Sequence, residues 1–491
     1  MAEENQYLKP FFLDDWEPVH ENGTTVQIKD KEELFDELCS DIKKAFNKEW
    51  EANQDTLSDS LQLVRDAIIG KDIAVTAIKN KIGDYLRIND KAVEWHPPWY
   101  SNLVDAVFHE NWGLAGLAEF FTPKYKDLPS AKVIGDRVYF LIDGVTTLMP
   151  QRIPTVRRQQ LVRALCMDNP SERFDKDFHN VYINPDKGNE RVTIYNETMT
   201  KKNQDVIIIR RYIVPNYTLE EQVNRKTILP EMIPFIEAMV YLGYNISVTG
   251  PLRSAKTTLL ACLLGLPQYR VKEGEKREDA NKTLEGLLLE TDPEIDITKI
   301  NPGAPIIQIV ADGERLSGKE AGVGGIVKSL MRSDLEAIWI GEARDGLALD
   351  TIITLANKGT RRSKMTFHSK DPEQFCTDVA AEIVKYTGST MELTESRVAK
   401  SFDYVIHMAP LRDKSKKRLK GIYDVAYNAK TKEIKIVPIC EYKYATDSWE
   451  FQYYISPDKR EDGMDEDYEG FMIFDKLLKE LAEKYPMSES E

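Results

Sequence analysis

The chain has 491 residues, of which 42% are hydrophobic and 30% charged, a composition typical of a globular protein rather than a disordered one. This length predicts about two to four domains. The formal net charge of −15 argues against a surface that broadly coats nucleic acid, because such binding requires lysine and arginine to neutralise phosphates. A local basic rim stays compatible with this charge.

The cysteines and the N-terminus bear on the compartment. No pair of cysteines has CxxC spacing, so we expect neither a disulfide framework nor a structural zinc site. The five are Cys39, Cys166, Cys262, Cys376 and Cys440. The N-terminus lacks the basic and apolar regions of a signal peptide, and no apolar stretch approaches the roughly 20 residues of a membrane span. We therefore expect a cytoplasmic protein that meets a membrane only through a partner.

Residues 1–95 are expected to form a helical accessory segment. Apolar residues recur every fourth position between Glu32 and Trp50, and a similar pattern runs from Leu61 to Tyr85. The prolines in His96-Pro97-Pro98 end this pattern, because consecutive prolines cannot continue a helix. We favour a helical cap on its own core over a docking arm for a partner.

Residues 99–225 are expected to form an α+β domain. The stretch from Val133 to Val145 reads as strands with a tight turn at Asp143-Gly144. Two further β-branched runs are Arg191–Tyr195 and Val206–Tyr212.

Arg210 and Arg211 follow directly after an apolar run, at the expected end of a strand. A guanidinium in this position can reach a phosphate across a domain interface, where its planar fork makes paired hydrogen bonds. On these two residues alone, a solvated surface pair is the stronger interpretation.

The stretch from Tyr244 to Leu266 reads as a strand, a glycine-opened loop and an apolar helix. Its loop has phosphate-loop spacing, in which backbone N–H groups surround phosphates, the Lys contacts β/γ oxygens and the Thr hydroxyl helps to hold Mg²⁺. The candidate binding residues are Gly250, Ser254, Ala255, Lys256, Thr257 and Thr258. Ala255 departs from the pattern, which has Gly there, so its Cβ either crowds the phosphate or is tolerated at ordinary φ.

Carboxylates and a histidine follow later strands of the expected α/β core, residues 226–440. An acidic cluster, Glu290 to Glu294, ends one apolar run, and Glu342 ends the strand from Leu335. The second pattern is typical of a Walker B element, in which a buried strand presents a carboxylate to Mg²⁺ and the attacking water. His368 follows a further short strand, and we favour a polar sensor near the phosphate or Mg²⁺ site over a structural role.

The rest of the chain carries weaker signals. We expect helices at 325–332 and 372–385, and a basic hairpin tip at 414–418, most often a solvated feature. Residues 441–491 read as a C-terminal tail with an acidic linker, 461–469, and a terminal helix, 471–484.

Taken in order, these motifs resemble the secretion-type traffic ATPases of type II and type IV secretion and of type IV and Tad pili. The likeness covers residues 99–485 and is closest to the Tad pilus assembly ATPases. The supporting stretches, besides the phosphate loop, are residues 112–117, 209–212, 217–221 and, most specifically, 331–344.

The resemblance implies an α/β fold with a RecA-like P-loop ATPase core behind an α+β N-terminal domain and a helical extension. It implies a homohexamer that uses ATP and Mg²⁺ to drive an inner-membrane platform protein, without direct nucleic acid. The roles that carry over are Lys256 and Thr257 for phosphate and Mg²⁺, Glu342 for Mg²⁺, Glu294 for the attacking water, His368 as the His-box residue, and Arg210, with Arg211, for phosphate capping.

Three departures from the family pattern keep alternatives open. Ala255 replaces a glycine, Glu290-Thr291-Asp292 changes an acidic pair, and Lys358-Gly359-Thr360 stands where Thr-Gly-His is usual. The alternatives are a nucleotide-binding assembly subunit with little hydrolysis and a conjugative type IV secretion ATPase. A DNA-translocating motor is disfavoured by the acidic charge balance.

Overall fold

The computed structural model describes most of the chain, which divides into two compact units, Met1–Ile213 and Val214–Glu491. The described residues are 24–52, 57–91, 93–167, 178–183, 190–195, 199–202, 204–211, 217–271, 276–290, 294–310, 335–343, 346–413 and 416–488. The finer division at 95, 225 and 440 stays a prediction.

The N-terminal unit combines helices with an antiparallel sheet of order β3-β2-β1-β6-β5-β4. The strands are β1 (Ser130–Ile134), β2 (Arg137–Ile142), β3 (Val145–Arg152), β4 (Phe178–Ile183), β5 (Glu190–Tyr195) and β6 (Val206–Arg210). The helices are α1 (Thr24–Ala52), α2 (Leu57–Ile68), α3 (Asp72–Asn89), α4 (Leu103–Asn111) and α5 (Thr155–Met167), with short 3₁₀ helices at Ala115–Phe121 and Pro123–Tyr125.

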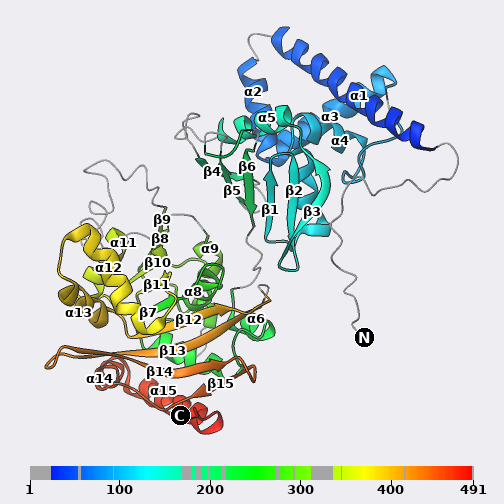
Figure 1. Ribbon diagram of the computed structural model, residues 1–491. Helices are drawn as coiled ribbons and strands as arrows, with labels where there is room; N and C mark the ends of the chain where they lie inside the picture. The colour runs from blue at the N-terminus through cyan, green and yellow to red at the C-terminus, as the bar shows by residue number, and fades with distance from the viewer. Residues whose placement is uncertain are drawn as a thin grey trace, which may run out of the picture. The chain divides into compact units, whose positions relative to one another are not determined.

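One face of this sheet packs on helices (Figure 1). Val133, Phe140 and Ile207 alternate with less buried neighbours and share one core with apolar residues of α1, α3 and α4. The predicted turn at Asp143-Gly144 is present, with φ of 47° and 79°, and it joins β2 to β3. Both values lie in the left-handed region that a type I′ hairpin turn requires.

The C-terminal unit is built on a nine-stranded sheet of order β15-β14-β13-β12-β7-β11-β10-β8-β9. The strands are β7 (Ile246–Thr249), β8 (Gly286–Glu290), β9 (Ile306–Val310), β10 (Ala337–Ala343), β11 (Lys364–Phe367), β12 (Tyr404–Pro410), β13 (Lys417–Asn428), β14 (Glu433–Lys443) and β15 (Ser448–Phe451). The six strands from β12 to β9 run parallel, and β13, β14 and β15 add antiparallel pairs at one edge.

Helices cover both faces of this sheet, as a parallel sheet requires (Figure 1). One core joins α7, α8 and α15 to β7 through residues such as Val248, and another joins α11, α12 and α13 to β10 and β11. The helices are α6 (Leu219–Asn224), α7 (Met232–Tyr241), α8 (Lys256–Gly265), α9 (Ile297–Ile300), α11 (Gly346–Ala356), α12 (Phe375–Thr387), α13 (Met391–Ser401), α14 (Pro457–Glu466) and α15 (Tyr468–Lys484). The predicted α/β core, which follows an α+β unit and a helical extension in the chain, is confirmed.

Several expected elements differ from the structure. Residues 461–469, expected as an acidic linker, lie mostly in α14, which begins with a proline, a residue favoured in the first helical turn. The pattern expected to run from Leu61 to Tyr85 is two helices separated at Gly70, whose φ is 90°. The helix expected at 325–332 and two residues of the basic tip, 414 and 415, lie outside the described residues. None of the described helices is long and apolar enough to span a bilayer.

Candidate active site

The phosphate loop follows β7, a four-residue strand whose side chains are all buried. Gly250 opens the loop with φ of 146°, and a Cβ at this position would collide with the backbone oxygen of Met408 on the neighbouring strand β12. Only glycine fits such a close approach at positive φ. The loop therefore begins at a point fixed by the sheet.

Two other loop residues adopt the left-handed conformation although they carry side chains. Arg253 has φ of 61°, and Ala255 has φ of 69° and ψ of 31°. The left-handed conformation costs a residue with a Cβ about 1–2 kcal/mol. Ala255 thus keeps a backbone shape that suits glycine, and the alternative of ordinary φ is wrong. Loops that alternate in this way turn successive N–H groups toward one centre and bind anions.

Ser254 and Lys256 provide the polar side chains at the loop. The hydroxyl of Ser254 is buried and has no hydrogen-bond partner among the described residues. Lys256 is the first residue of α8 and is 6% exposed; its Nζ donates to Pro251 O at 3.0 Å. Thr257 and Thr258 follow in the first turn of this helix. A buried ammonium at a helix N-terminus is suited to hold an anion.

Lys256, His368 and Glu342 form a continuous polar chain. Lys256 Nζ lies 3.1 Å from His368 Nδ1, and His368 Nε2 lies 2.7 Å from Glu342 Oε1. With a charged lysine, Nδ1 accepts a hydrogen bond and Nε2–H donates to the carboxylate, which defines the tautomer. The three residues meet because β7, β11 and β10 are parallel neighbours whose carboxyl ends share one edge.

Glu290 organises the segment that carries Glu294. Its Oε1 accepts the backbone N–H groups of Glu294 at 3.1 Å and Ile295 at 3.2 Å, and its Oε2 accepts from Gln308 Nε2 at 2.9 Å. Its carboxyl lies against Gly341, where an added Cβ would meet Glu290 Oε1 at 2.8 Å. Burial raises the pKa of Glu290 to about 7, although these hydrogen bonds oppose the rise.

Arg210 and Arg211 belong to the N-terminal unit. Arg210 ends β6 and is exposed. The Arg211 guanidinium is engaged inside its own unit: it donates to Glu190 Oε1 at 3.1 Å and lies 4.1 Å from the centre of the Phe120 ring. It also donates to the backbone oxygens of Phe120, Tyr125 and Lys126. A role in phosphate capping stays a prediction for both arginines.

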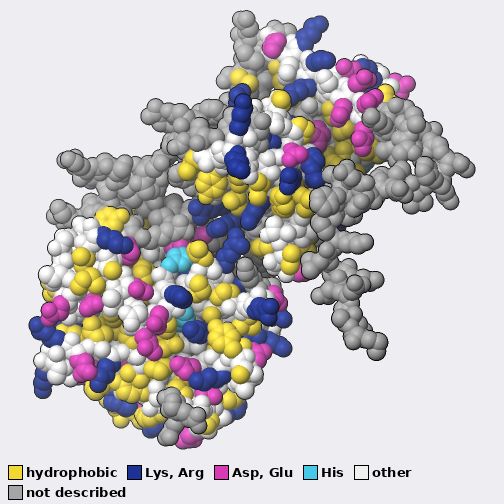
Figure 2. Space-filling model, viewed as in Figure 1, with side chains coloured by type: hydrophobic (Ala, Val, Ile, Leu, Met, Phe, Trp, Pro, Cys, Tyr) yellow, Lys and Arg dark blue, Asp and Glu magenta, His cyan; other side chains and the backbone are white. Residues whose placement is uncertain are grey.

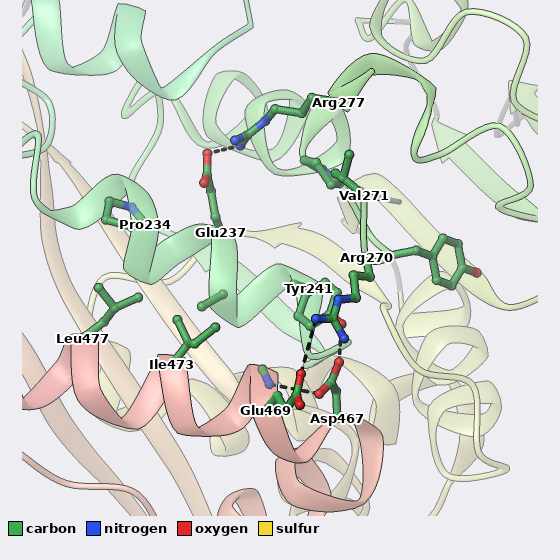
Figure 3. A pocket seen from close by; sticks show the side chains of 14 residues that line it. Pro234, Glu237, Tyr241, Arg270, Val271, Arg277, Asp467, Glu469, Ile473 and Leu477 are labelled. Carbon is green, nitrogen blue, oxygen red and sulfur yellow. Dashed lines mark hydrogen bonds and ion pairs between the residues drawn. The ribbon is translucent and has the colours of Figure 1, made fainter. Parts of the chain in front are cut away.

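A pocket of about 370 Å³ lies between α7, α15 and residues 267–271 (Figure 3). Ile473 and Leu477 contribute apolar surface, and Arg270 pairs with Glu469 at 3.3 Å. None of the predicted site residues lines this pocket.

The residues at the carboxyl edge fit a magnesium nucleotide. The buried Ser254 hydroxyl and the left-handed loop suit phosphate oxygens, and Thr257 with Glu342 offers the oxygen ligands that Mg²⁺ prefers. On the face of the C-terminal unit shown in Figure 2, positive and negative side chains are interspersed.

Sequence reasoning missed three polar residues near this edge: the buried Glu290, as an organising group, the buried His407 and the half-buried Gln308. Glu290 was included only in an acidic cluster at the end of an apolar run. The signal for His407 was a single titratable residue within the apolar strand VIHMA. Such a residue is usually structural, so the sequence alone favours no function for it.

No family model matches the chain, and no curated protein sequence matches it. Solved structures do. The chain is similar to the VirB11 ATPase from the Brucella suis type IV secretion system, with 16% identity, coverage of 61% of this chain and 92% of that chain, and a TM-score of 0.31. It is similar to the Legionella pneumophila ATPase DotB, with 15% identity, coverage of 73% and 85%, and a TM-score of 0.45.

A third similar structure is the pilus retraction motor PilT with bound ADP, with 12% identity, coverage of 74% of this chain and 91% of that chain, and a TM-score of 0.40. The assignment to the Tad branch stays a prediction. Function rests on the geometry of the site, because similarity at this level concerns the fold.

Proposed function

We propose that the C-terminal unit binds ATP with Mg²⁺ at the loop between β7 and α8 and hydrolyses it. The observation that carries this proposal is the chain from Lys256 through His368 to Glu342, beside a left-handed loop with a buried, unbonded hydroxyl. A cation and a carboxylate joined by an imidazole, next to an anion-binding loop, are groups suited to phosphoryl transfer.

In this proposal each residue has a defined task. Lys256 neutralises charge on the β- and γ-phosphates, and Thr257 and Glu342 hold the metal, partly through water. When bound, Mg²⁺ supplies charge neutralisation at the transferring phosphoryl group. Glu294 orients the attacking water, and Glu290 fixes the Glu294 backbone by accepting its N–H at 3.1 Å. His368 links the phosphate contact to the metal ligand, because its Nδ1 contacts Lys256 and its Nε2 contacts Glu342.

The output of hydrolysis would be domain motion rather than a transformed organic substrate. From the resemblance we propose a homohexamer on the cytoplasmic face of the inner membrane, which drives a platform protein of a pilus or secretion system. Arg210 remains, on the resemblance alone, the proposed contact of the γ-phosphate. Light scattering of the purified chain with and without magnesium ATP tests the oligomer, and a monomer under both conditions contradicts it.

The main alternative is a subunit that binds nucleotide but hydrolyses it slowly. It is favoured by Ala255 and Arg253, which place two side chains in a loop that bends at positive φ. A conjugative secretion ATPase would share the same chemistry and differ in its partners.

Phosphate release by the purified chain tests the proposal. We expect turnover in the native chain and its loss in Glu342→Gln, because this change removes the anionic ligand and alters the contact with His368. Turnover that appears only in Ala255→Gly supports the slow-hydrolysis alternative. Full turnover in Glu342→Gln contradicts the site assignment.

A further inference from the structure

His407 lies in the sheet beside the origin of the phosphate loop. Strand β12 runs parallel to β7, with His407 opposite Thr249, the last residue before the loop. His407 is 1% exposed and Thr249 is fully buried. The Thr249 Oγ1 and His407 Nδ1 atoms are 2.9 Å apart, so the two side chains share a hydrogen bond in the interior.

The next residue of β12 also bears on the loop. The backbone oxygen of Met408 faces Gly250 so closely that a Cβ there could not be accommodated. The register between β12 and β13 shifts between His407 and Met408. Irregularities of this kind re-aim backbone groups and are common beside functional sites. The irregular end of β12 therefore forms the wall against which the loop begins.

The charge state of His407 suits a fixed contact. Burial, together with Lys420 and Lys256, lowers its pKa to about 4 against the opposing effect of Asp371. The imidazole is neutral at physiological pH, so it adds no charge beside Lys256. A neutral ring in one tautomer can hold Thr249 throughout the cycle.

We propose that His407 is a positioning residue, which acts through its hydrogen bond to Thr249 to set the first residues of the phosphate loop. The inference goes beyond the proposed function, and its effect on nucleotide affinity rests on that function. His407 touches no phosphate in this scheme. It fixes the strand end from which Gly250 departs, so its loss weakens binding more than it slows the chemical step.

A double-mutant cycle on the full chain tests the inference without nucleotide. In His407→Leu and in Thr249→Val we expect the amides of residues 250–256 to exchange with deuterium about tenfold faster, since each change removes the same bond. The double variant should exchange no faster than either single variant. His407→Asn, which can place a polar atom near the Nδ1 position, and Thr249→Ser, which retains the hydroxyl, should stay near the native rate.

Binding of a fluorescent ATP analogue with Mg²⁺ provides the second measurement. We expect the Kd to rise about tenfold in His407→Leu and kcat at saturating ATP to change less than threefold, with both restored in His407→Asn. Additive exchange in the double variant, or unchanged exchange at 250–256, overturns the inference. If the native chain binds no nucleotide but the exchange cycle is non-additive, the proposed function fails and the positioning role stands. If His407→Leu does not fold, the Thr249→Val and Thr249→Ser pair decides, because only the former should loosen the loop.

Discussion

The two ends of the parallel strands in the C-terminal unit both bury polar side chains, but they do so in different ways. At the amino end, Asn245 uses every polar group: its side chain accepts from Ser363 N at 2.8 Å and donates to Ser401 O at 3.0 Å, and its N–H donates to Asp403 at 2.7 Å. At the carboxyl end, Ser254 buries a hydroxyl that has no partner among the described residues, beside the strained Ala255.

Buried cations sharpen this contrast. At the amino end, Lys459 Nζ lies 3.3 Å from Asp403 Oδ1 and 2.7 Å from Asp458 Oδ2. Burial alone would lower the pKa of Lys459, but the attraction of these carboxylates is larger, so the pKa is raised overall. Lys364 is buried there among neutral acceptors, Gln268 and the backbone of Arg362, and burial lowers its pKa. Buried hydroxyls without a partner among the described residues occur at the amino end as well, at Ser363 and Tyr404. What sets the carboxyl end apart is that its Ser254 hydroxyl and its lysine lie at a left-handed loop suited to an anion, whereas the lysines of the amino end contact groups of the fold.

The largest expected effect comes from removing the cation of the carboxyl end. Lys256→Met should lower turnover at least about 100-fold, because a charge-assisted contact to the transferring phosphate is lost. The midpoint of thermal unfolding should move by only a few degrees. Phosphate release and calorimetry measure the two effects. If Lys256→Met unfolds easily but its folded molecules turn over ATP at the native rate, Lys256 serves the fold rather than the reaction, and the prediction is wrong.

Removing the paired cation of the amino end should act on stability instead. Lys459→Met leaves Asp403 and Asp458 without their partner and should lower the free energy of unfolding by about 3–5 kcal/mol. Urea unfolding measures this, with Lys476→Met, an exposed lysine paired to Glu480, as the matched control near zero. The folded fraction of Lys459→Met should bind nucleotide as the native chain does.

The pH dependence of stability separates the ends further. Between its ordinary value and about 7, Glu290 holds a proton in the folded chain but not in the unfolded chain, so its contribution to stability falls as pH rises through this range. We expect native stability to lose on the order of 2 kcal/mol relative to Glu290→Gln from pH 5 to pH 8. His407, whose pKa is lowered to about 4 in the folded chain, makes stability rise with pH over its own titration range. This contribution is the same in the native chain and in Glu290→Gln, so it cancels when the stabilities of the two proteins are subtracted.

A parallel pH dependence in the native chain and in Glu290→Gln would show that this carboxyl is ionised in the folded state at pH 5.

The smallest expected effect concerns backbone strain. Ala255→Gly should raise the free energy of unfolding by about 0.5–1 kcal/mol, because the left-handed conformation costs alanine more than glycine. Ala482→Gly in α15 is the matched control, with a loss of about 1 kcal/mol expected in a helix. If urea unfolding shows that Ala255→Gly lowers the free energy of unfolding, as Ala482→Gly should, the loop is not strained at Ala255.

The sequence was sufficient for those parts of the site that depend on strand order alone. Glu342 and His368 were predicted to lie near the phosphate or Mg²⁺ site because each stands at the end of an expected strand, and the structure brings their polar atoms together with that of Lys256. Helix α14 was missed because its charged composition resembles a linker, and because the carboxylate of Asp403 that pairs with its buried Lys459 lies far away in the sequence.

The partners of Glu290 and His407 were beyond sequence reasoning for a physical reason. His407 meets Thr249 across 158 positions, and which side chains oppose each other in a sheet depends on register. The conformation of Ala255 was likewise undetermined, because its φ depends on the loop between β7 and α8 rather than on the residue itself.

The central place of β7 has a consequence for biosynthesis. Its neighbours in the sheet are β11 and β12, which end at Phe367 and Pro410, far downstream of the strand that they flank. A nascent chain that has just emerged with residues 246–266 has nothing to pair them with, and closing such distant contacts is slow. The phosphate loop should therefore acquire its shape only after Pro410 has left the ribosome, and ribosome-bound chains stalled before β11 should exchange or be cleaved readily at 250–256.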